Sequence, residues 1–382
     1  METKKTVKTF AVASFLNDLG SDMIAPVWPL FLVSVLGANM AIIGLIDGLG
    51  DAIVSISQAI SGYASDRLRK RKVFIWIGYL CAGISRIGYA FTTVWQYVIP
   101  FKILDRAGKM RGAPRDAIIA DISTAENRGS NFGILRAMDN LWAVFGIIIS
   151  IMLFSSLGFR TLFLIAAIPS LIGAAPIFFF IKEKAPSRKI FPGMSLKDIG
   201  PNLRLVFFLN AIFALGSFNY SFLMIFAQKF GVEIALIPVL YLIFNVVAAA
   251  FSIPFGRLTD RLGRKPVLMI AFVCWALTCF SLIYSQSHWV IIMAFVVYGF
   301  HKAAVDTSQT TLVSELAPAD YRASTLGGFQ MVMGICALPA SMLAGIMWDK
   351  ISPLAPFYFS LALTILSMLL LVFVKEGVKM VK

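Results

Sequence analysis

The chain has 382 residues, of which 59% are hydrophobic and only 14% charged, and its mean hydropathy is +0.82. Soluble domains carry about 25% charged residues, so this composition excludes an ordinary soluble domain and predicts a membrane protein. A formal net charge of +14 could indicate a nucleic-acid partner. The basic residues gather in the loops between apolar segments, however, and this placement argues against nucleic acid.

Apolar stretches of about 20 residues, the length that crosses a bilayer as a helix, recur along the whole chain. We predict twelve membrane-spanning helices and an all-α membrane protein. The first six are expected at 9–36, 40–64, 73–92, 95–120, 131–156 and 160–181, and the last six at 203–229, 235–256, 266–285, 289–313, 324–347 and 354–374. The polar stretch 182–202 is expected to be a linker between an N-terminal bundle, 1–181, and a C-terminal bundle, 203–382.

Lysine and arginine are concentrated at both ends of the chain and in alternate loops, including 67–72, 182–204 and 257–265. The positive-inside rule therefore places both termini and the linker on the cytoplasmic side of the cell (inner) membrane, which requires an even number of crossings. Asp18 and Asp22 interrupt the first apolar stretch, and no small-residue cleavage site follows it. We expect a retained first helix rather than a removable signal peptide.

The sequence contains two copies of one charged turn, at 62–71 and 256–265, which lie 194 residues apart. The same offset relates a second set of residues: Asp121, Arg128 and Gly133 correspond to Glu315, Arg322 and Gly327. Because equal offsets are unlikely to arise by chance in different apolar surroundings, each half is predicted to be one structural repeat.

The second copy of the turn reads Gly-x-x-x-Asp-Arg-x-Gly-Arg-Lys, and with two sets of six predicted helices it resembles the major facilitator superfamily (MFS) over nearly the whole chain. The first copy has Arg69 in place of the glycine. A backbone with positive φ would cost an arginine roughly 1 kcal/mol or more, so the first turn is expected to differ in shape. The segment from Asp105 to Asp121, which begins Asp-Arg-Ala-Gly-Lys, resembles a prokaryotic subgroup of this family.

The resemblance implies two six-helix bundles around a cavity at the middle of the membrane, which rock to open it to either side in turn. It also implies a charged gating latch at the cytoplasmic ends of the helices. Its expected residues are Gly62, Asp66, Arg67, Arg128, Gly256, Asp260, Arg261, Arg264 and Arg322. The alternative is that these are solvated loop charges that only set the topology.

Ionisable residues within the predicted helices lie mostly in the first half. Each costs about 2.5–3.5 kcal/mol at the centre of a bilayer, so such residues persist chiefly where they face a bundle interior or a wet cavity. The candidates for proton coupling or substrate contact are Asp18, Asp22, Asp47, Asp51, Arg86, Asp105, Arg106, Arg136 and Asp139. The second half offers Asn219, Tyr241 and Asn245 as substrate contacts on an otherwise apolar and aromatic wall.

Two pairs of acids share a helix face, Asp18 with Asp22 and Asp47 with Asp51. Repulsion and desolvation favour a bound proton on one member of each pair near neutral pH, which could couple proton movement to substrate movement. The alternative is that salt bridges to Arg86, Arg106 or Arg136 hold these acids and only fix the packing of the helices.

Three further sets of residues have expected roles. Arg111 and Arg115 are expected to reach lipid phosphates at the cytoplasmic end of their helix. His301, beside the pair Lys302 and Asp306, is expected to be a hydrogen-bonded packing residue rather than a proton relay. The four cysteines lie in apolar segments without metal-binding spacing and are expected to be packing residues.

No phosphate-binding loop, nucleophile motif or metal-binding cluster is visible, so we expect neither an enzyme nor a cofactor or metal site. The leading hypothesis is a secondary active transporter, a monomeric proton-coupled antiporter that exports a small amphipathic or cationic compound across the lipid bilayer. Two other kinds of transport remain open. One is uptake by symport of an anionic metabolite held by Arg86, Arg106 and Arg136. The other is efflux of a divalent cation through Asp18, Asp22 and the asparagines. A membrane sensor or scaffold is the alternative outside transport.

Overall fold

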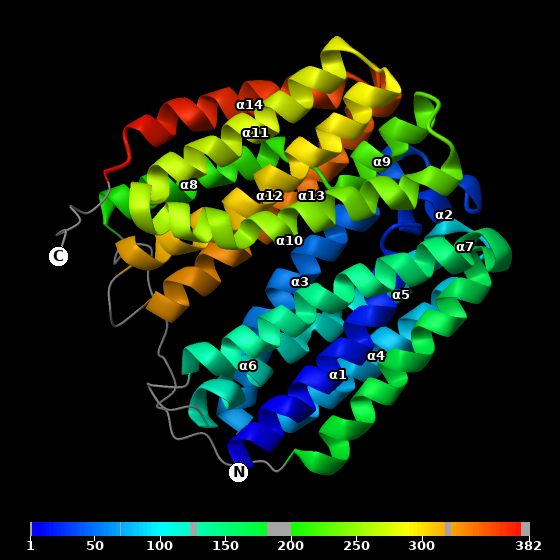
Figure 1. The fold of residues 1–382 in the computed structure, drawn as a ribbon, viewed down its shortest axis with the longest axis vertical. Helices are drawn as coiled ribbons and strands as arrows, with labels where there is room; N and C mark the ends of the chain where they lie inside the picture. Colours follow the sequence, from blue (N-terminus) through cyan, green and yellow to red (C-terminus); the bar gives the residue numbers. More distant parts are fainter. Residues whose placement is uncertain (1, 69, 123–127, 182–199, 318–321, 376–382) are drawn as a thin grey trace. The chain divides into compact units, whose positions relative to one another are not determined.

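The computed structural model describes residues 2–68, 70–122, 128–181, 200–317 and 322–375 (Figure 1). Side chains are described over the same ranges except at 2–5, 7, 66, 117, 119–122, 128–142 and 322–324. All regular structure in these ranges is helical. Contacts divide the chain into two compact units: unit 1 comprises 1–38 and 49–191, and unit 2 comprises 39–48 and 192–382.

Unit 1 contains α1 (Glu2–Ile24), α2 (Trp28–Ser34), most of α3 (Met40–Leu68), α4 (Lys72–Phe91), α5 (Trp95–Ala107), the 3₁₀ helix η1 (Gly108–Arg111), α6 (Gly112–Ile122) and α7 (Arg128–Phe180). Helix α7 consists of two arms that meet at Gly158, where φ is 70°. Both arms pack against α1, which lies beside them in Figure 1. The buried core at one end of this unit joins Phe10, Ile75 and Ile177 from α1, α4 and α7.

Unit 2 contains the start of α3, then α8 (Pro201–Gly216), α9 (Tyr220–Lys229), the 3₁₀ helix η3 (Ile234–Leu236), α10 (Ile237–Leu262), α11 (Arg264–Tyr284), α12 (His288–Leu316), α13 (Arg322–Lys350) and α14 (Ala355–Val372). Helix α12 packs on α10 and α11, and α14 packs on α8 and α11. Phe218, Phe226, Trp275, Trp348 and Phe357 form much of the aromatic core of this unit.

Nine helical stretches in the described residues are long and apolar enough to cross a membrane. Three of the twelve predicted segments are broken: 9–36 into α1 and α2, 95–120 into α5, η1 and α6, and 203–229 into α8 and α9. The first break comes just before Pro29, at the second position of α2, and the third lies at Asn219, which caps α9. Neither α1 nor α5–α6 is among the nine, because both carry several charged residues. The total of twelve crossings stays a prediction.

The first turns of α3 pack on α13 with almost no space between the two backbones. A Cβ on Gly44 would strike the Ser341 carbonyl oxygen, and one on Gly345 would strike the Met40 carbonyl oxygen. Asp349, in the last turn of α13, accepts hydrogen bonds from the backbone amides of Met40 at 3.2 Å and Ala41 at 2.8 Å. The carboxylate thus satisfies two of the amide groups that a helix start leaves without partners. This seam explains why 39–48 belongs to unit 2.

Adding one methyl group in this seam should destabilise the protein. We expect Gly44→Ala to lower the stability of the fold by roughly 1–3 kcal/mol, because the two backbones must separate. Gly328→Ala on α13 is the matched control, since a Cβ there meets no atom within 4 Å. The measurement is the midpoint of thermal unfolding in detergent. Equal midpoints for the two variants would contradict the tight packing of α3 on α13.

Candidate functional site

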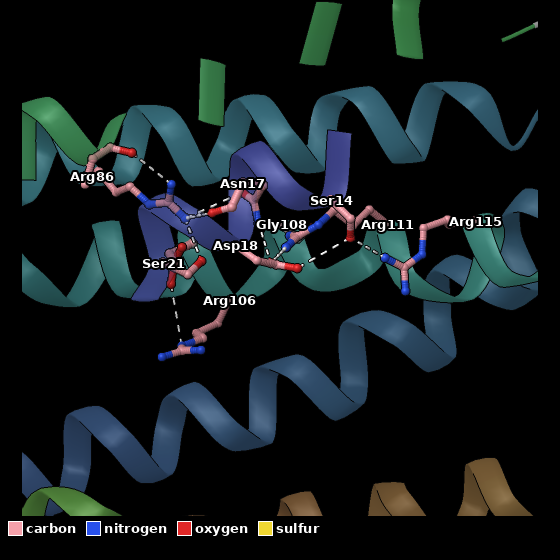
Figure 2. Close-up of polar contacts among 11 residues, drawn as sticks. Ser14, Asn17, Asp18, Ser21, Arg86, Arg106, Gly108, Arg111 and Arg115 are labelled. Carbon is pink, nitrogen blue, oxygen red and sulfur yellow. Dashed lines mark hydrogen bonds and ion pairs between the residues drawn. The ribbon is translucent and has the colours of Figure 1, made fainter. Parts of the chain in front are cut away.

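A fully buried arginine holds three helices of unit 1 together. The residue, Arg86 on α4, is 2% exposed. One terminal nitrogen donates to the Ala166 carbonyl oxygen of α7 at 3.1 Å, and the other donates to α1, to the Ser21 hydroxyl at 2.7 Å and the Asn17 carbonyl at 3.2 Å (Figure 2). Gly20 makes room for this group, because a Cβ there would strike both the guanidinium and the Ala166 oxygen.

The carboxylate of Asp18 on α1 lies next to this arginine network. The Asn17 side-chain amide donates to Asp18 at 3.0 Å, and the Ser14 hydroxyl donates to it at 3.4 Å. Its charged partner is Arg111, with 3.8 Å between Nη2 and Oδ1. The Asp18 side chain is 20% exposed, whereas that of Arg111 is 7% exposed. The acid is therefore the more exposed of the two partners, and Arg111 is enclosed by protein.

The expectation that Arg111 and Arg115 reach lipid phosphates is wrong, since they are only 5% and 8% exposed. Arg111 donates to the Gly108 carbonyl oxygen at 2.9 Å, and Arg115 donates to the Ser14 hydroxyl at 2.7 Å. The physical reason is the break in the predicted fourth helix. There η1 approaches α4 so closely that a Cβ on Gly108 would lie 2.6 Å from the Gly78 carbonyl oxygen.

Three charged residues of α5, Lys102, Asp105 and Arg106, form a charged stripe within unit 1. Lys102 is 3% exposed, and its ammonium lies 4.2 Å from the centre of the Trp28 ring, a cation–π contact. Asp105 and Arg106 form an ion pair at 3.6 Å. Gly50 on α3 faces this stripe, because a Cβ there would lie 3.0 Å from Lys102. These charged side chains therefore have partners within the protein.

A second cluster of polar residues lies in unit 2, at the break between α8 and α9. Asp47 is 4% exposed, and the Ser221 hydroxyl donates to its Oδ2 at 2.5 Å. Asn219 caps α9 by accepting from the Ser221 amide at 3.2 Å. Tyr220 stacks edge-on against Tyr241, with ring centroids 4.9 Å apart.

Three of the predicted site residues of the second half are thus close neighbours. The Asn245 side-chain amide donates to the Tyr241 carbonyl oxygen at 2.8 Å. Asn219 precedes Tyr220 in the chain, and the Tyr220 ring contacts the Tyr241 ring. Of the predicted acid pairs, Asp18 and Asp22 both belong to unit 1. Asp47 belongs to unit 2 and Asp51 to unit 1.

The second charged turn has the shape expected from its sequence. Gly263 adopts φ 107° between α10 and α11. The Arg264 guanidinium binds Glu315 at 2.6 Å and Asp260 at 3.9 Å. Arg261 is exposed. Sequence reasoning did not assign Glu315 to the latch, although the 194-residue offset already placed it opposite Asp121.

Several predicted residues lie outside the described part of the chain or have side chains that are not described. They are Asp66, Arg69, Arg128, Arg136, Asp139 and Arg322. Of the first turn, the structure shows Gly62 within α3, where a Cβ would lie 3.5 Å from Ala113, and an exposed Arg67. Gly256 lies within α10, with no atom within 4 Å of a Cβ placed there.

His301 is a packing residue, as predicted. It is 7% exposed, and its Nδ1 lies 2.8 Å from the Ala271 carbonyl oxygen. Trp275 and Phe213 pack against the ring, with centroids 5.3 and 5.8 Å away.

Comparison with known proteins identifies the class of this molecule. The family model of the Major Facilitator Superfamily matches residues 10–203 and 206–381. The chain belongs to this family of membrane transporters, and the predicted family and all-α membrane fold are confirmed.

Its relatives show how far the likeness extends. The chain is 37% identical to the uncharacterized MFS-type transporter MJ1317 of Methanocaldococcus jannaschii, over 98% of this chain and 96% of that protein. It is 29% identical to the tetracycline resistance protein, class H, of Pasteurella multocida, over 40% of this chain and 36% of that one. The crystal structure of a D-xylose-proton symporter shares the fold with a TM-score of 0.78 and 16% identity, covering 98% of both chains.

Enlarging Gly20 should disrupt the arginine network. We expect Gly20→Ala to lower stability by roughly 1–3 kcal/mol, because the new methyl group must displace Arg86 or the α7 backbone. Gly62→Ala in the same unit is the control, since its Cβ would make only an ordinary contact at 3.5 Å. Thermal unfolding in detergent compares the two variants. A Gly20→Ala protein as stable as the control would contradict the arrangement around Arg86.

Proposed function

We propose that this protein is a monomeric secondary transporter of the cell membrane that exports a small amphipathic or cationic compound in exchange for protons, with both termini in the cytoplasm. Membership of a transporter family supports transport by alternating access rather than catalysis. The likeness to a tetracycline resistance protein favours export of a drug-sized organic compound.

The observation that carries the coupling is the pairing of Asp18 with Arg111. The carboxylate is the more exposed partner, so it is the group of this pair on which we place the exchanged proton. Protonation removes the negative charge and leaves Arg111 as an enclosed cation without its counter-charge, which is costly in a medium of low dielectric constant. Binding of a proton to Asp18 therefore weakens the contact between α1 and η1. Movement of these two segments can then bring another counter-charge to Arg111.

The same network weighs against the other transport hypotheses. An anionic substrate held by Arg86 would have to displace its bonds to Asn17, Ser21 and Ala166, which already use both terminal nitrogens. A divalent cation at Asp18 would have to displace Arg111.

We propose a latch in the second charged turn, with Arg264 as its centre. This guanidinium joins the start of α11 to the end of α12 through Glu315, and to α10 through Asp260. Charge-assisted bonds of this kind hold helix ends in one arrangement and can be exchanged for others during a cycle.

Replacing Asp18 tests the coupling. In proteoliposomes, flux of ethidium, used as an amphipathic cation, should follow an imposed pH gradient for the wild type. Asp18→Asn should reduce this gradient-driven flux to the level of empty liposomes, because the variant cannot exchange a proton at that position. Asp116→Asn is the matched control, since Asp116 also binds an arginine, at 3.1 Å, but is 34% exposed. Wild-type flux that ignores the pH gradient would refute proton coupling.

The latch can be tested by comparing its two acids. Glu315→Gln should slow transport severalfold, because it removes the close charged partner of Arg264. Asp260→Asn should have little effect, since its 3.9 Å contact is made by a side chain that is 77% exposed and screened by water. Initial rates of ethidium flux in proteoliposomes give the comparison, with circular dichroism to check folding. Equal rates for the two variants would argue against a latch at Glu315.

A further inference from the structure

An exposed pair of opposite charges lies in the middle of a membrane-spanning helix of unit 2. Lys302 and Asp306 on α12 are joined at 3.0 Å, and their side chains are 48% and 57% exposed. At 1.5 Å per residue, Lys302 is about 21 Å from the first residue of α12 and Asp306 about 15 Å from the last. Neither end is within reach of these side chains, so snorkelling to the membrane surface does not explain the pair.

Lipid is excluded as the environment of this pair. Each charge at the centre of a bilayer is costly, and charged residues within spanning helices face protein or a water-filled cavity. The other face of α12, which includes His301, Ala304, Ser308 and Leu312, is buried by packing. The exposed face continues one turn further to Thr310. Lys302, Asp306 and Thr310 therefore form an exposed polar stripe that lipid does not cover.

Stabilisation of α12 does not explain the presence of the Lys302–Asp306 ion pair. An acid four residues before a base is the favourable order in a helix, and here the base comes first. Exposed pairs at this spacing also contribute little to folding. The positions 194 residues earlier are Gly108 and Gly112, so the first repeat has no counterpart of the pair.

We propose that Lys302 and Asp306 bind an organic ligand that carries both a cationic and an anionic group. The ligand's ammonium would bind Asp306 and its carboxylate would bind Lys302, in place of the bond between the two side chains. A ligand with a single charge would satisfy one side chain and leave the other without that partner, so the site favours zwitterions. This inference rests on the proposed transport function and narrows its substrate class.

Three probes with one skeleton test the charge requirement: phenethylamine is a cation, 3-phenylpropionate is an anion, and phenylalanine is a zwitterion. A ligand that binds the folded state raises the midpoint of thermal unfolding. For the full-length wild type in detergent, phenylalanine should give the largest shift. Lys302→Gln and Asp306→Asn should each weaken phenylalanine binding roughly tenfold, as expected for loss of one charged hydrogen bond.

Two controls separate ligand binding at Lys302 and Asp306 from the stability of the fold and from proton coupling. The double variant Lys302→Asp with Asp306→Lys keeps an ion pair in the favourable order, so its unfolding midpoint without ligand should match or exceed that of the wild type. Asp18→Asn should keep the phenylalanine shift, because this binding needs no proton gradient. A flux assay that shows no proton coupling would therefore not change the expected phenylalanine shift.

The proposal is overturned if the wild type responds equally, or not at all, to the three probes. It is also overturned if Lys302→Gln and Asp306→Asn keep the full phenylalanine shift. The opposite result is that the two single variants lose phenylalanine binding and yet unfold, without ligand, at the wild-type temperature. That result would support direct contact of phenylalanine with Lys302 and Asp306.

Discussion

The cost of placing a polar or charged group in a hydrocarbon environment governs the interior of this protein. No water is available at the centre of a bilayer, so a side chain such as Arg86 can persist only if protein groups accept its hydrogen bonds. Its acceptors are neutral: a carbonyl oxygen from α7, and a hydroxyl and a carbonyl oxygen from α1. The positions of α1, α4 and α7 are therefore fixed by one guanidinium as well as by apolar packing.

The two units satisfy this requirement in different ways. In unit 1, arginines and acids of α1, α4, η1 and α6 form a connected polar network, of which the contact between Asp18 and Arg111 is one part. In unit 2, aromatic rings and amides predominate at the break between α8 and α9, and Asp47 is bound by a neutral hydroxyl. The charged residues of this network are linked through shared partners, since the Ser14 hydroxyl contacts both Asp18 and Arg115. The second unit therefore satisfies buried polar groups such as Asp47 and Asn245 mainly with neutral partners.

The fold class and the glycine turn at Gly263 were predictable because they depend on local rules, namely apolar length and backbone conformation. The packing role of His301 followed from the same kind of reasoning. The partner of Asp18 was not predictable, because it depends on how a helix break redirects the chain. Arg111 was assigned to the membrane surface because 95–120 was predicted as one membrane-spanning helix, and the 3₁₀ turn beginning at Gly108 places it against α1 instead.

Breaks in helices were also the main source of error in the predicted segments. Pro29 and Asn219 are visible as helix starters, but a sequence does not show whether an apolar segment tolerates interruption until its neighbours are known. The close approach of α3 to α13 was hidden for a similar reason. Gly44 and Gly345 are ordinary residues of apolar helices until the contacts of Gly44 with the Ser341 backbone and of Gly345 with the Met40 backbone are seen.

The division of α3 between the units has a consequence for biogenesis. Residues 39–48 leave the ribosome early, yet the carboxylate that completes the start of this helix belongs to Asp349, which lies 309 residues beyond Met40. The start of this helix is therefore completed by a residue from the distant second half of the chain. A polypeptide cut within 182–199 would carry the start of α3 on one fragment and Asp349 on the other, so the two amides would regain this acceptor only when the fragments associate.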